Sequence, residues 1–212
     1  MISRLTIAGL FVSSLWAADA GTSKLLKNIE DRYNRVQTLQ TAFQETLVNQ
    51  GRRRTESGEL FLRKPGRMRW EYRSPAVKLF VSDGKSVYFY STETNRAEKM
   101  KLKETEDMRA PMAFLLGRLE FEKDFKDFRI AAENASTRIT AAPKSDKMPY
   151  REVAFLVGQD LRIERLIVTG QDASVLDFTF TDEKLNPKLA DSLFKFQLPA
   201  GAEMVDGSRE VR

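Results

Sequence analysis

Apolar and polar residues alternate along residues 60–90, through two turns and into a third strand. After the proline-glycine turn, Met68, Trp70 and Tyr72 share one side of a strand, and charged residues occupy the other side. Period-two alternation of this kind is typical of a β-sheet with one apolar and one solvated face. The sequence therefore predicts that something apolar, either protein or ligand, covers the face that carries Trp70.

The chain before this stretch predicts one helix and one strand. Apolar residues recur at helical spacing from Ser23 to Val36, which indicates an amphipathic helix, and residues 39–48 change to the period of a strand. Residues 49–57 interrupt the apolar pattern and are predicted to form a hairpin loop or its frayed edge. This loop contains Arg52, Arg53 and Arg54, which we interpret as a solvated surface, with contact to a partner or a lipid headgroup as the alternative.

The remaining chain is predicted to be mainly antiparallel sheet. The Asp83-Gly84 pair predicts a tight hairpin between strands at 77–82 and 87–90. Short, turn-rich connections then join five predicted strands at 125–132, 138–142, 152–157, 162–169 and 175–181. A short helix from Asn186 through Asp191 and a last strand containing Phe194 and Phe196 complete the chain. Many antiparallel strands with three helices predict an α+β domain in which a curved sheet wraps helices on one side.

The third predicted helix, residues 110–117, is almost wholly apolar. Pro111 suits its first turn and Gly117 its end. Because a helix that is apolar all round is normally buried, we predict a lid across the aromatic face of the sheet, with a plain core helix as the alternative.

The first 20 residues have the features of a secretory signal peptide. A short cationic start precedes an apolar run over residues 5–16 and the small-x-small sequence Ala18-Asp19-Ala20. The run is shorter than the roughly 20 residues that a membrane-spanning helix needs. We predict that residues 1–20 are removed and that residues 21–212 form a single domain beyond the inner membrane.

Composition excludes several kinds of site. The chain has no Cys and no His, which excludes Cys-His and Ser-His nucleophile arrangements and any zinc site with a His ligand. Its 30 Asp and Glu residues form no pair of recognisable spacing, so an enzyme would have to work with carboxylates alone. We predict no catalytic residue, metal ligand or cofactor. The net charge of +5 permits contact with anionic headgroups or an acidic protein surface, and nucleic acid is not expected as the partner of an exported protein.

Several stretches in a characteristic order and spacing resemble the LolA family of periplasmic carriers of outer-membrane lipoproteins. They are Phe43 to Glu45, Gly58 to Trp70, Pro75, Val81-Ser82-Asp83-Gly84-Lys85, Val87 to Tyr90, Pro111 to Leu116, Asn186 to Phe196, Pro199 and Gly201. The resemblance runs from about residue 23 to residue 206. It implies a strongly curved antiparallel sheet, an incomplete β-barrel, covered by helices, with an apolar cavity between them that receives acyl chains.

The resemblance also implies the residues of the site. Well-known members carry an arginine before the turn proline that holds the lid helix shut through its backbone, and the matching residue here is Lys64. Lys64 shares the strand face of Leu60 and Leu62, whereas Arg63 lies on the opposite face. A lysine offers a point charge in place of a planar fork of donors, so a latch at Lys64 would hold the lid more weakly or in another direction. The predicted acyl-chain cavity consists of Phe43, Leu60, Leu62, Met68, Trp70, Tyr72, Met112, Leu115 and Leu116.

By this resemblance, the protein is predicted to carry the acyl chains of lipoproteins through the periplasm as a monomer without a cofactor. The expected donor is an inner-membrane ABC transporter similar to LolCDE, and the expected acceptor is an outer-membrane receptor similar to LolB. Two alternatives remain open. One is a carrier of the same fold for another lipid, such as a glycolipid or a polyene-type lipid, and the other is a periplasmic lipid-sensing or regulatory protein.

Overall fold

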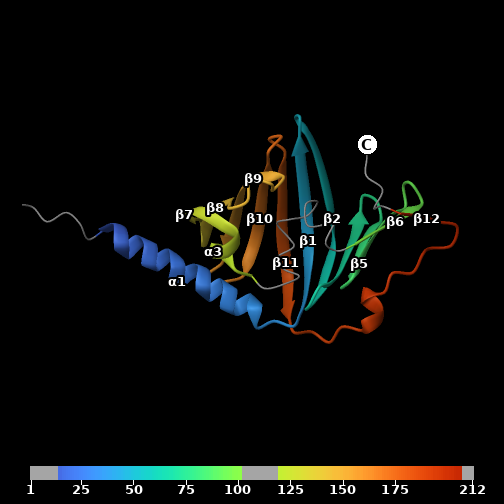
Figure 1. Ribbon diagram of the computed structural model, residues 1–212, viewed down its shortest axis with the longest axis horizontal. Coiled ribbons are helices and arrows are strands. Elements are labelled where there is room, and N and C mark those ends of the chain that lie inside the picture. Colours follow the sequence, from blue (N-terminus) through green and yellow to red (C-terminus); the bar gives the residue numbers. More distant parts are fainter. Residues whose placement is uncertain (1–13, 102–118, 207–212) are drawn as a thin grey trace, which may run out of the picture.

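The computed structural model describes residues 14–101 and 119–206, and the strands in these ranges form one curved 12-stranded sheet (Figure 1). Their order across the sheet is β12-β6-β5-β4-β3-β2-β1-β11-β10-β9-β8-β7. Neighbouring strands are antiparallel, except that β12 runs parallel to β6. The strands are β1 (Thr38–Asn49), β2 (Arg52–Arg63), β3 (Arg67–Ser74), β4 (Lys78–Asp83), β5 (Ser86–Ser91), β6 (Arg96–Lys101), β7 (Phe125–Glu133), β8 (Ser136–Pro143), β9 (Tyr150–Val157), β10 (Ile163–Gly170), β11 (Val175–Leu185) and β12 (Glu203–Asp206). The prediction of a large, open, mainly antiparallel sheet is confirmed.

Helices are few in the described ranges. They are α1 (Ser14–Asn34), the single turn α3 (Phe121–Asp124) and the 3-10 turn η2 (Asp191–Phe194). Helix α1 begins at Ser14 rather than at Ser23, so it continues through the predicted cleavage site, and removal of residues 1–20 stays a prediction. Within residues 14–101 and 119–206, no helix combines the length and the apolar character needed to cross a membrane.

Helix α1 packs on one face of the sheet, along the half that contains β7–β10 (Figure 1). Its buried residues Leu26, Ile29 and Tyr33 are spaced three and four apart, so they lie on one side of the helix and join the main core. Next to them, the Asn34 amide donates to the carbonyl oxygen of Leu119 and accepts from its N–H, both at 2.8 Å. The end of helix α1 therefore holds the backbone of Leu119 in place.

The sheet residues that share this core form what we call the inner face. Cross-strand register places Leu60 of β2 between Thr41 of β1 and Trp70 of β3, and Trp70 opposite Phe80 of β4, so these side chains point to the same side. The inner face comprises the buried residues Leu39, Phe43, Leu60, Leu62, Met68, Trp70, Tyr72, Phe80, Val87, Leu166 and Phe178.

The opposite, outer face is covered by the segment that follows β11. The Phe196 ring stacks on Tyr88 with a centroid distance of 5.0 Å, and the Arg63 guanidinium lies 5.1 Å from the centroid of the Phe194 ring. Arg69 donates to the carbonyl oxygen of Leu193 at 3.3 Å. This second, smaller core carries the chain across the outer face to β12.

These contacts correct two predictions for the C-terminal region. The predicted helix from Asn186 through Asp191 is wrong, because the only turn of helix in this stretch is η2, which begins at Asp191. The predicted strand containing Phe194 and Phe196 is also wrong. Phe194 is buried at the end of η2, and Phe196 stacks from the irregular segment that follows it. The last strand lies further on, at Glu203–Asp206.

The hairpin predicted at residues 49–57 is present, but its loop is much shorter than predicted and its edge is paired rather than frayed. Strands β1 and β2 form a continuous hairpin with a two-residue turn at Gln50 and Gly51, which have φ of 49° and 75°. Positive φ at both turn residues matches the right-handed twist of the paired strands. Arg52, Arg53 and Arg54 therefore lie at the start of β2, where they are exposed.

Candidate functional site

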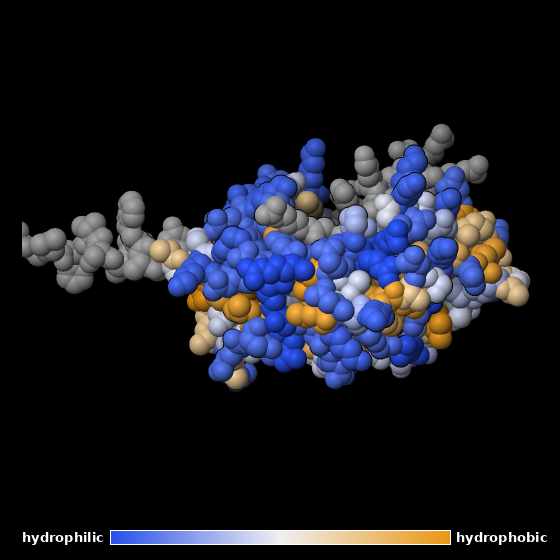
Figure 2. Space-filling view, turned by 90° about the horizontal axis from the view of Figure 1, so that it is seen from below, coloured by the Kyte–Doolittle hydropathy of each residue, from blue (hydrophilic) through white to orange (hydrophobic). Residues whose placement is uncertain are grey.

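The structure brings together six of the residues predicted for the acyl-chain cavity. Phe43, Leu60, Leu62, Met68, Trp70 and Tyr72 all lie on the inner face, and each is at most 4% exposed. The other three, Met112, Leu115 and Leu116, lie outside the described residues. Seen from below, the molecule shows mainly hydrophilic residues with small separate apolar patches (Figure 2).

Aromatic rings form the centre of the inner face. The Phe43 ring contacts those of Trp70 and Tyr72 edge-on, each at a centroid distance of 5.0 Å. Trp70 also contacts Phe178 at 5.5 Å. Edge-to-face contacts favour defined relative orientations of the rings, whereas leucine and methionine side chains adapt more readily to an irregular neighbour.

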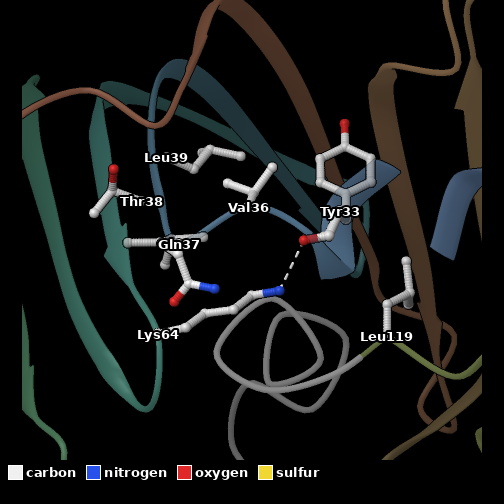
Figure 3. Close-up of a pocket in the computed structure, with 8 residues that line it drawn as sticks. Tyr33, Val36, Gln37, Thr38, Leu39, Lys64 and Leu119 are labelled. Atoms are coloured by element: carbon white, nitrogen blue, oxygen red, sulfur yellow. Dashed lines mark hydrogen bonds between the residues drawn. The ribbon is translucent and has the colours of Figure 1, made fainter. Parts of the chain in front are cut away.

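Lys64 lies at the lower rim of the inner face, in a pocket lined by the end of α1 and the start of β1 (Figure 3). Its ammonium donates to the carbonyl oxygen of Tyr33 at 2.8 Å. A cation suits this position, because the last carbonyls of a helix lack intrahelical partners and carry partial negative charge. Burial lowers the pKa of Lys64 below its usual value. Arg63 contacts Asp191 and the Leu189 carbonyl on the outer face instead.

The predicted latch on the lid is not tested by this contact, since residues 111–116 lie outside the described ranges. The hydrogen bond from Lys64 to Tyr33 connects the turn that contains cis-Pro65 to the end of α1. The latch role of Lys64 stays a prediction.

A second pocket opens beside the first, between α1 and the middle of the sheet. Leu60, Leu166 and Phe180 provide its apolar walls, and Tyr33 and Glu183 provide polar groups. The Tyr33 hydroxyl donates to Glu183 Oε2 and accepts from the Ile163 N–H, both at 2.8 Å. Arg32 donates to Glu183 Oε1 at 2.6 Å. The polar groups of Tyr33 and Glu183 are therefore engaged with the protein, and they anchor α1 to β10 and β11.

This anchor predicts a pH-dependent effect of Tyr33→Phe. The substitution leaves the Ile163 N–H without its acceptor and should cost about 2 kcal/mol of unfolding free energy at pH 7. Burial, and then the negative charge of Glu183, raise the pKa of Tyr33 above the value in the unfolded chain. The contribution of the hydroxyl is therefore fully present below the unfolded pKa near 10 and is lost as the pH rises above it.

Urea unfolding of wild type and Tyr33→Phe at pH 7 and at pH 10.5 measures both effects, and the gap between the two proteins should narrow at the higher pH. The matched control is Tyr88→Phe, because the Tyr88 ring packs on Phe196 at the outer face. It should lose little stability at pH 7. An unchanged gap at the higher pH would exclude the Tyr33 hydroxyl as the titrating group.

The upper end of the inner face, toward the β1–β2 turn, carries charge. The Lys78 ammonium bonds Glu56 Oε1 and lies 5.4 Å from the centroid of the Tyr72 ring, while the Tyr72 hydroxyl donates to Glu45 Oε2 at 2.5 Å. Glu45 and Glu56 are cross-strand partners, and Arg54 adds a 3.2 Å ion pair to Glu56. Glu45, Glu56 and Lys78 are each at most 9% exposed. We call these residues the ionic cluster, and on β2, β3 and β4 the apolar residues of the inner face end at it.

Sequence reasoning missed the ionic cluster, although the register contained a signal for it. Glu45 and Glu56 occupy positions with the same parity as Phe43 and Leu60, so charged residues stand where the alternation calls for apolar ones. In the described ranges, no group of three or more acidic residues is placed to hold a metal ion.

Comparison with known proteins identifies the family. The family model described as "Outer membrane lipoprotein carrier protein LolA" matches residues 34–197. Outer-membrane lipoprotein carrier proteins of Chromobacterium violaceum and Nitrosospira multiformis are 27% and 28% identical, covering 80% and 92% of this chain and 82% and 92% of their own. An uncharacterized conserved protein from Thermus thermophilus shares the fold with a TM-score of 0.56 at 13% identity, over 88% of this chain and 99% of that one. Because the family model spans the chain from the end of α1 to beyond η2, the protein belongs to the LolA family.

Proposed function

We propose that this protein is a periplasmic carrier that binds the acyl chains of lipoproteins against its inner face. The proposal includes an apolar cavity that opens between the sheet and the helices that cover it. In this proposal an inner-membrane ABC transporter similar to LolCDE loads the protein, and an outer-membrane receptor similar to LolB receives the cargo. It assigns no catalytic residue and no cofactor.

The observation that carries this proposal is the continuity of the inner face. Apolar side chains from β1, β2, β3, β4, β5, β10 and β11 meet in one cluster on one side of the sheet. Two pockets run along its border with α1. Acyl chains are long and have no directional bonding, so they need a surface of this kind rather than a small site with many polar groups. The curated relatives named as lipoprotein carriers support the choice of cargo.

The magnitude of the hydrophobic effect explains why such a carrier must exchange one apolar site for another. Burial of a methylene stabilises by roughly 0.8 kcal/mol, so exposure of one chain of about 16 carbons to water would cost on the order of 12 kcal/mol. Release into water is therefore far too slow to be useful. Direct transfer from one apolar face to the next cancels most of this term and leaves the direction to differences of a few kcal/mol.

The direct test is native mass spectrometry of the purified protein mixed with a synthetic triacylated lipopeptide. A one-to-one complex is expected with this probe, and none with the same peptide lacking its acyl chains. Failure to bind the acylated probe would overturn the proposal. Extraction and identification of the lipid that copurifies with the protein addresses the cargo, and a glycolipid or polyene-type lipid in place of lipoprotein would replace the proposed cargo with another.

Two variants with a photo-crosslinking residue test where the ligand binds. Benzoylphenylalanine at Leu62 lies on the inner face beside Met68, whereas the same residue at Gln44 lies on the exposed side of β1. Crosslinks to the acyl chains are expected from position 62 and not from position 44. Equal labelling from both positions would show that the probe attaches to the surface without entering the inner face.

A further inference from the structure

One donor on the inner face has no acceptor. Trp70 is 1% exposed, and among the described residues its Nε1 and the Nε of Arg32 are the buried side-chain atoms without a hydrogen-bond partner. Buried tryptophan N–H groups usually find a partner, because an unpaired donor in an apolar site keeps its desolvation penalty. Arg32 is already paired with Glu183 through Nη2, so Trp70 is the side chain whose polar group is entirely unused.

The neighbours of Trp70 do not supply an acceptor. Its ring meets the edges or faces of Phe43, Tyr72 and Phe178, and contacts of an N–H with a ring are weak compared with a bond to an oxygen lone pair. Two polar groups on neighbouring positions of the inner face are already engaged: the Tyr72 hydroxyl donates to Glu45. On the other side, the Thr41 hydroxyl donates to the Thr181 carbonyl.

The position of Trp70 relates this donor to the proposed ligand. Leu60, its cross-strand partner, lines the second pocket, and so does Phe180, which stacks on the Trp70 neighbour Phe178 at 6.0 Å. Trp70 therefore stands between the leucine-lined pockets and the ionic cluster. A lipid that extends from these pockets along β2 and β3 would reach this donor.

From these observations, and resting on the proposed function, we propose that the Trp70 indole N–H binds the carbonyl oxygen of an acyl ester or amide. A neutral carbonyl satisfies the donor without the large cost of burying an isolated charge, which argues against a phosphate or a free carboxylate at this point. The cargo would then be recognised as an acyl group rather than as a bare hydrocarbon. Its chain would extend from Trp70 toward the pockets that contain Leu60 and Leu62.

Three neutral probes of equal chain length test this assignment: methyl laurate, N-methyl lauramide and dodecyl methyl thioether. Their affinities are measured by displacement of Nile red from wild type and from Trp70→Phe, which keeps an aromatic ring and removes the N–H. The ester and the amide should bind about fivefold to tenfold more weakly to the variant, the size expected for one net hydrogen bond. The thioether, whose sulfur is a weak acceptor, should change less than twofold.

Each probe is compared with itself, as the ratio of its affinities for wild type and for the variant, so the hydration free energy of the free probe cancels. The probe that loses more affinity in Trp70→Phe, the ester or the amide, identifies the linkage that Trp70 binds. If the thioether weakens as much as the other two, Trp70 acts by packing alone and the assignment is overturned. If wild type binds none of the probes, the carrier function fails rather than the role of Trp70.

A spectroscopic readout observes the donor directly. The chain has two tryptophans, and the other, Trp16, lies in the predicted signal peptide. In protein labelled with 15N-tryptophan, the Trp70 indole proton should move downfield with the amide probe and stay in place with the thioether. Phe43→Leu is the matched control, since it removes an aromatic neighbour and keeps the N–H, and it should retain the preference for carbonyl probes.

Discussion

Replacement of Gly58 by alanine is expected to destabilise the protein by on the order of 4 kcal/mol, because the new methyl group has no space. A Cβ atom at Gly58 would lie 1.7 Å from the Glu71 carbonyl oxygen and 2.8 Å from its carbon. Both atoms belong to the backbone of β3, which pairs with β2 at this point, so relief of the clash requires the two strands to separate. Since small proteins are stable by only about 5–15 kcal/mol, such a loss would leave a large part of the protein unfolded at moderate temperature.

The same glycine also shapes the inner face. Gly58 lies in register between Phe43 on β1 and Tyr72 on β3, and the rings of these two residues meet across it at 5.0 Å. The Cα of Tyr72 lies 3.0 Å from an added Cβ at position 58, so relief of the clash would move Tyr72 relative to Phe43. Gly58→Ala should therefore disturb lipid binding even in the fraction of molecules that remain folded.

Urea unfolding followed by circular dichroism measures this prediction, with Gly51→Ala as the matched control. Gly51 has φ of +75° in the turn between β1 and β2, but nothing lies within 4 Å of its added Cβ. The control should lose only about 1 kcal/mol, the strain of a left-handed alanine. If Gly58→Ala loses no more than Gly51→Ala, then β2 and β3 can shift without cost and the close approach does not matter.

The sequence predicted the fold where one face of a strand is buried and the other is wet. Residues 60–90 alternate cleanly because Trp70 and its neighbours face the core while Arg69 and Arg67 face the other side, and three strands of the sheet follow from this. The family resemblance supplied what alternation cannot supply, namely that the curved sheet stays open as an incomplete barrel. It also joined the residues that alternation placed on one face, including Trp70, with Phe43 into one predicted site, and the structure brings six of these residues together.

The predictions of secondary structure failed where buried and exposed residues do not alternate. The start of β2 is exposed on both sides from Arg52 to Thr55, so no apolar period marks it as a strand. Strand β6 was likewise missed within a polar segment, because only Ala97 and Met100 of its six residues are buried. Phe194 and Phe196 caused the opposite error, a strand predicted where none exists. Their spacing of two is that of a strand, but Phe194 ends η2, and both rings pack onto residues far away in the sequence. Packing between residues that are distant in the sequence produces no local periodicity of apolar residues.

The ionic cluster provides the second large effect. Lys78→Met should destabilise the protein by roughly 3–5 kcal/mol, because it leaves the Glu56 carboxylate buried without its closest cation. Glu56 is 4% exposed, and its remaining partner Arg54 is more than half exposed and held at 3.2 Å, so it compensates only in part. The variant also removes the ammonium that lies over the Tyr72 ring.

The double variant Lys78→Met with Glu56→Leu distinguishes two effects: the loss of the ion pair itself and the cost of leaving the Glu56 carboxylate buried without a cation. Because two apolar residues of similar size leave no unpaired carboxylate, the double variant should recover most of the lost stability, and urea unfolding of all four proteins gives the coupling. Additive losses would show that the two side chains act independently, against the contact in the structure. Recovery would also mean that the ionic cluster is not required for stability as such. Its place at the end of the apolar residues on β2–β4 would then be the property to explain, since the double variant makes positions 56 and 78 apolar and leaves Glu45, held by the Tyr72 hydroxyl, as the buried carboxylate of the cluster.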